Sequence, residues 1–462
     1  MRSLFNSIVL DSDAKEHYVP SPMYTFLYNI LLAFAAVFLA PYYGAKIVLT
    51  GKYRRSIGPK FGFPAANGLE GIDGSPRIWV HAVSVGEVTA AAPIVAALRE
   101  RFPLAAIVLS TSTETGQEMA RKTIKGATAF IYFPLDIPSV IRRVLNRVRP
   151  DIVVPVETEV WPNFIRLCGE RGVKVLMVNG RLSPRSFRGY KKTRFFWTQI
   201  LRNIDEIGTI SETDAGRFRA LGADPARVRV IGNAKYDSLA ARALPALREE
   251  IAGKLNVPSD SRVLVAGSTH EGEERVVLSV WRRLLMEYPD LLLILVPRHV
   301  ERAGDVLRII RKEGFSDCST MSEIARGGRR KDERIIVVDI IGELFRVYSL
   351  ATVVYCGGSL VPKGGQNILE PASWGKVVFY GPSMEDFVDE KDSLEAAGAG
   401  LQVAGEMELF EGIQTLMKDP RSRKTRGDAG KAVVDSNRGA SGRYAGMVAD
   451  ALTREGKSKS AG

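Results

Sequence analysis

Four ionisable residues of the N-terminal half stand directly after apolar runs that have the composition of β-strands. Glu87 follows one run, Glu157 and Glu159 follow another, and Lys235 follows a third. A carboxylate at such a position can act as a general base, and a cation can stabilise negative charge that develops in a transition state. The stretch 84–87 also matches the S-x-x-E pattern of a helix capping box. The residues alone leave both a capping and a catalytic role open for Glu87.

The elements that position these residues alternate between short apolar runs and helix-length amphipathic segments, the pattern of a parallel sheet covered on both faces. In such sheets, ligands bind beyond the carboxyl ends of the strands, which is where the four residues lie. The predicted strands begin at Arg77, Ala105, Thr128, Asp151, Lys174, Glu206 and Val228 in the first half, and at Arg262, Leu291, Arg334, Ala351, Lys376 and Ala399 in the second.

The restart of the alternation near Arg262 predicts an α/β protein with two doubly wound domains. A charged segment with prolines separates the halves, as expected of a linker. We predict an N-terminal tail and membrane anchor over 1–45, a Rossmann-like domain over 46–240, a linker over 241–260, a second Rossmann-like domain over 261–420, and a C-terminal helix with a flexible tail over 421–462.

A run without charged residues, 19–45, contains a segment over 23–43 that is about long enough to cross a bilayer. It predicts a single membrane anchor, and the cations that follow it place the rest of the chain in the cytoplasm. A signal peptide is disfavoured by the acidic residues before the run and by the lack of an A-x-A site. Asn29 and Pro41 weaken a spanning helix, so a helix lying in the interface or in a protein core remains an alternative.

Composition excludes several classes of function. The 462 residues carry a formal net charge of +12, which favours anionic partners. Three cysteines and four histidines without ligand spacing make a zinc site or a disulfide framework unexpected, and we expect no metal. Phosphate-binding loops of kinases and dehydrogenases and the G-x-S-x-G elbow of hydrolases are absent. The D-x-D at 11–13 lies apart from both sheets, so we do not expect it to serve a metal-dependent sugar-nucleotide site.

Seven motifs occur in order between His81 and about Gly381, namely HAVSVGE, ETEVWPN, NGRLSPRS, GNAKYD, VPRH, GEL and GGSLVPKGGQNILEP. This combination resembles the 3-deoxy-D-manno-octulosonic acid (Kdo) transferases of lipopolysaccharide and lipid A biosynthesis. The resemblance implies a GT-B glycosyltransferase, with two Rossmann-like domains facing an interdomain cleft and an N-terminal anchor helix. It also implies inverting transfer of Kdo from CMP-Kdo to the lipid A precursor, lipid IVA, at the cytoplasmic face of the inner membrane, without a cofactor and without nucleic acid.

The resemblance also implies roles for individual residues. Glu87 corresponds to the general base, and Glu157 and Lys235 to stabilisers of the transition state. The first domain binds the acceptor and the second binds CMP-Kdo. The implied CMP contacts are Arg298, His299, Gly342, Glu343, Leu344, Asn367, Ile368, Leu369 and Glu370. We expect Gly364 and Gly365 to support the departing phosphate. Gln366 departs from the histidine that many family members have, which leaves the role of that side chain open.

The basic run 181–196 is most simply a solvated basic face. The sharper hypothesis is that it faces the phosphates of the acceptor or the membrane surface, with Arg181, Arg185 and Arg188 as acceptor contacts. Two alternatives to the whole interpretation remain open, another GT-B enzyme such as a lipid-disaccharide synthase or a nucleotide-sugar epimerase, and a membrane-tethered binding protein without turnover. The number of Kdo residues added, the acylation of the acceptor and the oligomeric state do not follow from the sequence.

Overall fold

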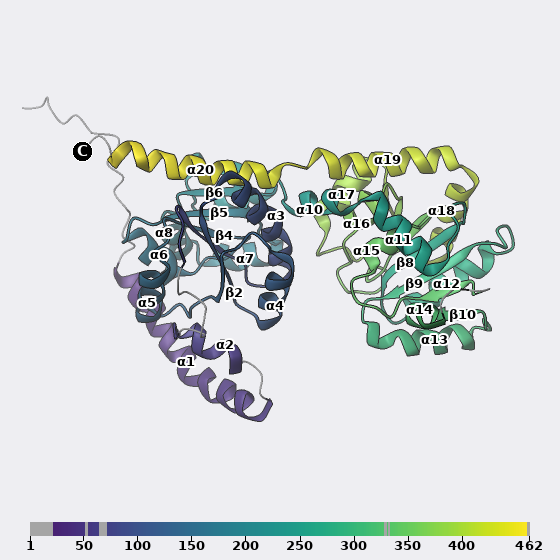
Figure 1. Ribbon diagram of the computed structural model, residues 1–462, viewed down its shortest axis with the longest axis horizontal. Coiled ribbons are helices and arrows are strands. Elements are labelled where there is room, and N and C mark those ends of the chain that lie inside the picture. Colours follow the sequence, from purple (N-terminus) through teal and green to yellow (C-terminus); the bar gives the residue numbers. More distant parts are fainter. Residues whose placement is uncertain (1–21, 51–53, 64–71, 328–329, 331–332, 460–462) are drawn as a thin grey trace, which may run out of the picture. The chain divides into compact units, whose positions relative to one another are not determined.

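A computed structural model describes residues 22–50, 54–63, 72–327, 330 and 333–459 of the chain (Figure 1). The chain forms two compact units. The first comprises Met1–Ser238 together with Gly439–Gly462, and the second comprises Leu239–Arg438. The first unit is therefore built from two separate stretches of sequence.

The first unit contains a parallel sheet of seven strands in the order β3-β2-β1-β4-β5-β6-β7. Its strands are β1 (Arg77–His81), β2 (Ala106–Thr111), β3 (Ala129–Tyr132), β4 (Ile152–Pro155), β5 (Lys174–Gly180), β6 (Glu206–Thr209) and β7 (Val228–Val230). Each coincides with a predicted strand. The order reverses between β1 and β4, and their carboxyl ends form the switch point where doubly wound sheets bind ligands.

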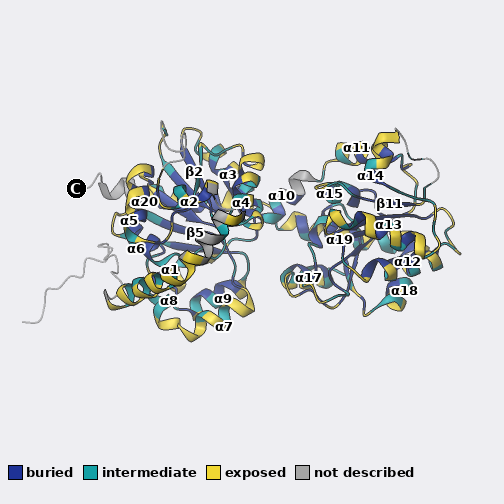
Figure 2. Ribbon diagram, turned by 90° about the horizontal axis from the view of Figure 1, so that it is seen from below, coloured by how far each residue is buried: buried dark blue, intermediate teal, exposed yellow. Residues whose placement is uncertain are grey.

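Helices cover both faces of this sheet. The helices of this unit are α1 (Pro22–Thr50), α2 (Arg54–Lys60), α3 (Val85–Arg101), α4 (Glu114–Thr123), α5 (Pro138–Val148), α6 (Pro162–Gly169), α7 (Pro184–Lys192), α8 (Arg194–Leu201), α9 (Glu212–Ala220), η1 (Pro225–Arg227) and α20 (Ala440–Lys459). Helix α10 (Lys235–Arg242) begins in this unit and ends in the second. One core lies between the sheet and α3, α4 and α20. The other lies between the sheet and α5, α6, α8 and α9. Figure 2 shows the strands as the buried layer.

The C-terminal helix α20 completes the first unit. Its apolar residues recur at helical spacing, and Tyr444 and Val448 are fully buried against residues of α3. The hydroxyl of Tyr444 donates a hydrogen bond of 2.8 Å to the carbonyl oxygen of Gly232, after β7. The segment predicted as a separate C-terminal helix over 421–462 is thus divided, because α20 belongs to the first unit and the preceding helix to the second.

Helix α1 docks on the first unit through one polar and aromatic face. The hydroxyl of Tyr28 donates to Asp136 Oδ2 (2.8 Å), and Asn29 Oδ1 accepts from the side chain of Asn163 (2.9 Å). The Tyr28 ring also lies 5.9 Å from that of Phe196 in α8. The opposite face carries exposed apolar side chains, among them Met23, Phe26, Leu27, Leu31, Phe34, Val37 and Phe38. Asn29, which weakens the segment as a membrane span, therefore serves the contact with the protein.

Over the ranges that the structure describes, no helix is long and apolar enough to cross a membrane. The D-x-D motif at 11–13 and the first residues of the uncharged run lie outside those ranges.

The second unit contains a parallel sheet of seven strands in the order β10-β11-β9-β8-β12-β13-β14. Its strands are β8 (Val263–Thr269), β9 (Leu292–Pro297), β10 (Cys318–Thr320), β11 (Ile335–Val337), β12 (Val353–Cys356), β13 (Val378–Tyr380) and β14 (Gly400–Gln402). The six predicted strands are confirmed, and β10 is an addition that the prediction missed. The order reverses between β8 and β12, which defines a second switch point.

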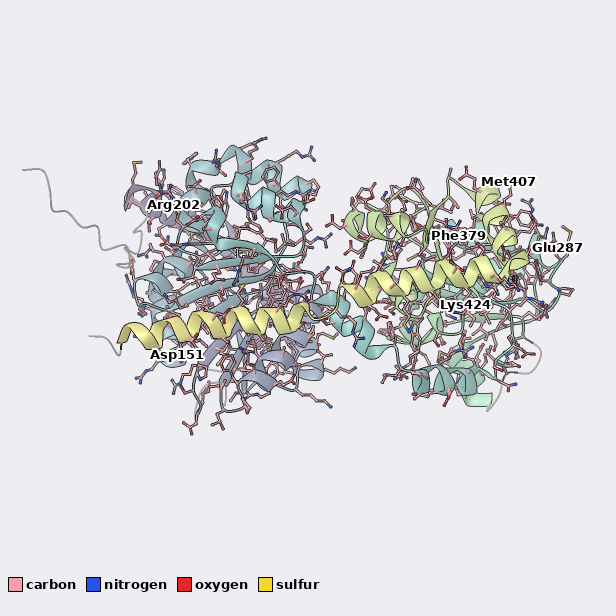
Figure 3. All side chains as sticks on the ribbon, turned by 90° about the horizontal axis from the view of Figure 1, so that it is seen from above. Asp151, Arg202, Glu287, Phe379, Met407 and Lys424 are labelled. Atoms are coloured by element: carbon pink, nitrogen blue, oxygen red, sulfur yellow. The ribbon has the colours of Figure 1, made fainter. Side chains whose placement is uncertain are left out.

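The helices of this unit are α11 (Pro245–Leu255), α12 (Glu273–Leu284), η2 (Val300–Arg302), α13 (Ala303–Lys312), α14 (Met321–Gly327), α15 (Leu344–Tyr348), α16 (Leu369–Ser373), α17 (Val388–Ala396), α18 (Glu406–Lys418) and α19 (Pro420–Ser436). The predicted linker over 241–260 contains α11, whose Ile251 and Leu255 are fully buried and which packs on α14 and α15. Phe379 of β13, labelled in Figure 3, is buried against Gly412 of α18.

Candidate active site

The switch point of the first unit brings together loops that are far apart in sequence. His81, at the end of β1, pairs with Pro155 of β4, and the amide of Val156 donates to the carbonyl oxygen of His81 (2.9 Å). The loop after β1 leads to Glu87, and the loop after β4 carries Glu157 and Glu159. The parallel register therefore places all three carboxylates at one edge of one sheet, as the sequence predicts.

Glu87 lies in the first turn of α3, and its carboxylate is held by the loop before the helix. Oε2 accepts a hydrogen bond from the amide of Val83 (2.7 Å), and Oε1 accepts one from the hydroxyl of Ser84 (3.0 Å). Ser84 is the N-cap residue, but its side chain accepts no hydrogen bond from a helix amide. The reciprocal bonds of a capping box are thus not formed, because the serine hydroxyl donates to the glutamate.

The pKa of Glu87 is raised to about 7, and burial is the largest cause, although the hydrogen bond from Val83 acts in the opposite direction. The negative charges of Glu159 and Glu157 contribute to this rise. A general base works best when its pKa lies near the working pH, because it is then substantially ionised and still binds a proton firmly. Glu87 has that property, and an ordinary surface glutamate does not.

Glu157 and Lys235 form an ion pair at the same sheet edge. The ammonium group of Lys235, at the start of α10, donates to Glu157 Oε1 at 2.8 Å, and the two side chains are 27% and 21% exposed. Glu157 has a φ of 63°, in the left-handed region that residues with a side chain rarely adopt. Such a conformation costs free energy and is often found where a side chain must point at a functional site. The structure therefore brings together the two residues to which the resemblance assigns stabilisation of the transition state.

The loop after β4 contains a further contact that reasoning from the sequence did not assign. Glu159 Oε2 accepts a hydrogen bond from Trp161 Nε1 (2.9 Å) and lies 3.7 Å from Nε2 of the buried His81. The His81 ring stacks on Phe133, with a centroid separation of 3.8 Å. The sequence offers only the strand-end position of these residues as a signal, since the contact depends on β1 and β4 being neighbours.

Helix α7 and the start of α8 present the predicted basic face. Arg185 and Arg188 are exposed, together with Lys191, Lys192 and Arg194, whereas Arg181 is partly buried before the helix. Phe195 is 59% exposed next to these cations. The face therefore combines positive charge with an exposed aromatic ring.

In the second unit, the predicted nucleotide contacts also lie at carboxyl ends of strands. Arg298 and His299 follow β9 and are exposed, and the His299 ring lies 5.9 Å from that of His270, which follows β8. Gly342 has a φ of 91° and precedes Glu343, the N-cap residue of α15. Leu344 begins that helix. The carboxylate of Glu343 contacts Lys254 at 3.5 Å and Arg346 at 3.5 Å.

The glycine-rich loop after β12 is packed rather than open. Gly364 and Gly365 have φ values of 80° and 79°, and a Cβ at either position would lie within 2.5 Å of a side chain. Their amides donate to Ser383 Oγ (3.0 Å) and to the carbonyl oxygen of Gly358 (2.9 Å). Both amides are thus engaged within the protein, and conformation and packing explain these glycines better than a direct bond to phosphate does.

The segment that follows begins α16. Asn367 Oδ1 accepts from the amide of Leu369 (3.1 Å), and its Nδ2 donates to Glu370 Oε1 at 3.5 Å. Ile368 is fully buried. Gln366 packs beside Gly358, because a Cβ on that glycine would lie 3.4 Å from the Gln366 side chain and 3.3 Å from His270.

Glu273, at the start of α12, organises the loop after β12 and was not predicted. Its side chain is 1% exposed. Its two oxygens accept hydrogen bonds of 2.7 to 3.1 Å from the amides of His270, Gly358, Ser359 and Leu360 and from the hydroxyl of Tyr355. Such a carboxylate fixes the backbone around it, since each donor would otherwise be buried without a partner. Glu273 therefore has a structural role in this unit.

Within the described ranges, no group of three or more His, Cys, Asp or Glu side chains has an arrangement that could hold a metal ion.

Comparison with solved structures identifies the architecture. A UDP-GlcNAc 2-epimerase from Neisseria meningitidis, solved with UDP-GlcNAc bound, matches with a TM-score of 0.56 at 14% identity, covering 82% of this chain and 100% of that one. At this identity the likeness shows the fold alone. It confirms the predicted GT-B type of fold, with two Rossmann-like domains.

Comparison at the level of sequence identifies the family. The profile of the family described as "3-Deoxy-D-manno-octulosonic-acid transferase (kdotransferase)" matches residues 55–238. A 3-deoxy-D-manno-octulosonic acid transferase from Haemophilus influenzae is 32% identical over 434 residues, which are 94% of this chain and 100% of the relative. One from Chlamydia pneumoniae is 30% identical, covering 88% and 92% of the two chains. This chain therefore belongs to the Kdo transferase family of glycosyltransferases.

Proposed function

We propose that this enzyme transfers Kdo from CMP-Kdo to the lipid A precursor, lipid IVA, in lipopolysaccharide biosynthesis, with Glu87 as the general base. The proposed role of Glu87 rests on the position of its carboxylate together with its raised pKa. The carboxylate lies at the switch point of the first sheet, and burial raises its pKa to about 7. Family membership supports the donor and the class of acceptor.

The proposed step is a single displacement. Glu87 takes the proton from a sugar hydroxyl of the acceptor as that oxygen bonds to the anomeric carbon of Kdo. The bond from the anomeric carbon to the phosphate oxygen breaks, and its electron pair leaves with CMP. Because CMP-Kdo carries the β sugar and the linkage formed is α, this displacement inverts the anomeric centre. Lys235, held by Glu157, stabilises negative charge that develops in the transition state.

The second unit is the proposed donor-binding unit. Arg298 and His299 are exposed at the end of β9, where a cation can reach a phosphate. The segments 342–344 and 367–370 complete the proposed CMP site, with their backbone conformation set by the glycine at 342 and by the bonds of Asn367. We propose no resident metal or cofactor, since these residues supply the charge that the leaving phosphate needs.

The first unit is proposed to meet the acceptor at the cytoplasmic face of the inner membrane. The exposed apolar face of α1 and the exposed cations of α7 and α8 support this, since apolar side chains enter the interface and cations attract anionic lipid. Figure 2 shows both exposed faces in yellow.

The donor distinguishes this proposal from a GT-B enzyme that uses a uridine nucleotide. We expect the purified protein to release CMP from CMP-Kdo only when the acceptor is present, as measured by a coupled assay for the nucleotide. Release of UDP from a UDP-sugar under the same conditions, with no release of CMP, would overturn the assignment of the donor.

The basic face predicts a selective effect on the acceptor. Replacing Arg185, Arg188 and Lys192 with glutamine should raise the Michaelis constant for lipid IVA about tenfold and leave that for CMP-Kdo within about twofold, since charge-assisted bonds to phosphate are lost. Steady-state kinetics with each substrate varied in turn measure both values. Replacing the exposed Arg421, Lys424 and Lys431 of α19 with glutamine gives a control of equal charge change. Equal increases in the two Michaelis constants would contradict the assignment of this basic face to the acceptor.

The pH dependence of the reaction reports on Glu87. Its pKa is raised to about 7, so the ionised form that accepts a proton is depleted below that pH. We expect log kcat/KM for the acceptor to fall with a slope of one as the pH drops below about 7, and to level off above it. This fall is the acidic limb of the pH profile. A profile without an acidic limb between pH 5.5 and 8.5 would contradict the role of a carboxylate with this pKa as the base.

A further inference from the structure

The carboxylate of Glu159 is held in one place by two neighbours. Its Oε2 atom accepts the 2.9 Å hydrogen bond from Trp161 and lies 3.7 Å from His81 Nε2. At 3.7 Å, the imidazole of His81 and the carboxylate of Glu159 interact electrostatically and do not form a hydrogen bond. The Glu159 side chain is 20% exposed, and the side chain of His81 is 1% exposed. A surface glutamate would sample many rotamers, whereas this one has fixed partners from its own loop and from β1.

The partners of Glu159 are themselves fixed. His81 Nδ1 lies 3.0 Å from the hydroxyl of Ser110 and 3.2 Å from its carbonyl oxygen, in β2. The Phe133 ring stacks on the His81 ring with a centroid separation of 3.8 Å, and its centroid lies 5.5 Å from that of the Trp161 ring. One aromatic ring therefore supports both groups that hold Glu159.

Several ionisable groups face the same sheet edge as Glu87. The charged or titratable groups are His81 from β1, Glu157 and Glu159 from the loop after β4, Tyr190 from α7, beside Glu159, and Lys235 from α10. Lys235 offsets the charge of Glu157 at 2.8 Å. Burial is the largest cause of the raised pKa of Glu87, and among the charges Glu159 acts more strongly than Glu157.

We propose that Glu159, held by His81 and Trp161, is a positioning residue whose fixed negative charge sets the strength of Glu87 as a base. The inference rests on the proposed function, in which Glu87 takes the proton of the acceptor. A negative charge beside a carboxylate makes the protonated form more favourable, so that the carboxylate binds a proton more firmly. Glu159 thereby makes Glu87 a stronger base than burial alone would.

The variant Glu159→Gln tests this inference through the pH profile of kcat/KM for the acceptor. Removing the charge should move the acidic limb to lower pH by about half a unit or more. On the plateau above pH 8 the rate should fall about two- to tenfold, because a weaker base transfers the proton less readily. Ionisation of the acceptor phosphates affects every variant equally, so the difference between profiles is the readout.

Two further variants separate charge from structure. Glu159→Asp keeps the negative charge and should leave the limb closer to that of the wild type than Glu159→Gln does. Glu118→Gln removes an exposed carboxylate from α4 of the same unit and should leave the limb in place. A limb that stays at its wild-type position in Glu159→Gln, or that moves equally in Glu118→Gln, overturns the inference while the base role of Glu87 stands. A wild-type profile without the limb counts instead against the proposed function.

Discussion

Replacing Glu87 with glutamine is expected to lower kcat by about 10²–10⁴, the range that a general base typically contributes. The amide oxygen of the new side chain can still accept the hydrogen bond from Val83, and the hydroxyl of Ser84 can turn to accept one from the new amide nitrogen, so the start of α3 should keep its conformation. Binding of CMP should be unchanged, because the proposed nucleotide contacts belong to the second unit. Steady-state rates, thermal unfolding and calorimetric titration with CMP measure the three quantities.

The matched control for this experiment is Glu212→Gln. Glu212 occupies the first turn of α9 in the same unit, and its carboxylate pairs with Arg219 on the surface. We expect that control to retain most of the activity. A Glu87→Gln enzyme that keeps its activity would show that the carboxylate only supports the loop before α3 and does not act as the base.

The second large effect is expected from Lys235→Met, which should lower kcat by about 10²–10³, comparable to the loss of one donor that stabilises developing negative charge. The substitution also leaves the partly buried Glu157 without its partner at 2.8 Å. A cycle with Glu157→Gln separates the two effects. If the pair acts as a unit, the double variant should be little worse than Lys235→Met alone.

Lys174→Met is the control for the loss of an ion pair. Lys174 contacts Asp205 at 3.4 Å in the same unit, at the start of β5 and so at the opposite end of that strand from the site. We expect a modest effect on kcat there. A Lys235→Met enzyme with kcat within about threefold of the wild type would contradict the role given to the cation.

The strands could be predicted from the sequence because buried parallel strands consist of nearly continuous apolar residues. Strand β2 has all six of its residues buried, and its pattern is unmistakable. Strand β10, at Cys318–Thr320, was missed since it is three residues long, lies at a sheet edge and carries two polar residues. A short edge strand buries too little apolar surface to leave a periodic signal.

The partners of the helices could not be predicted in the same way. The residues of α20 recur at helical spacing, yet nothing in that pattern says that Tyr444 packs on the first unit and not on the second. Similarly, α11 lies in a stretch whose charges and prolines resemble a linker, although Ile251 and Leu255 bury it. An amphipathic pattern specifies a face to be covered but not the element that covers it.

The candidate site was predictable to the level of strand ends. The positions of Glu87, Glu157 and Lys235 follow from the rule that ligands bind at the carboxyl ends of parallel strands. The hydrogen bonds of Glu87 with Val83 and Ser84 differ from those of a capping box, because a match to the S-x-x-E pattern does not specify which atom donates. The contact of Glu159 with His81 joins residues 78 positions apart and depends on the order of the strands.

The mass spectrum of the product formed from CMP-Kdo and a tetra-acylated, bis-phosphorylated glucosamine disaccharide tests the central claim most directly. We predict that the wild-type protein converts the disaccharide to a species heavier by one or more Kdo residues, and that Glu87→Gln forms almost none of it under the same conditions. An unmodified disaccharide after incubation with folded wild-type protein would contradict the proposed reaction, and equal product from Glu87→Gln would contradict the role of its carboxylate.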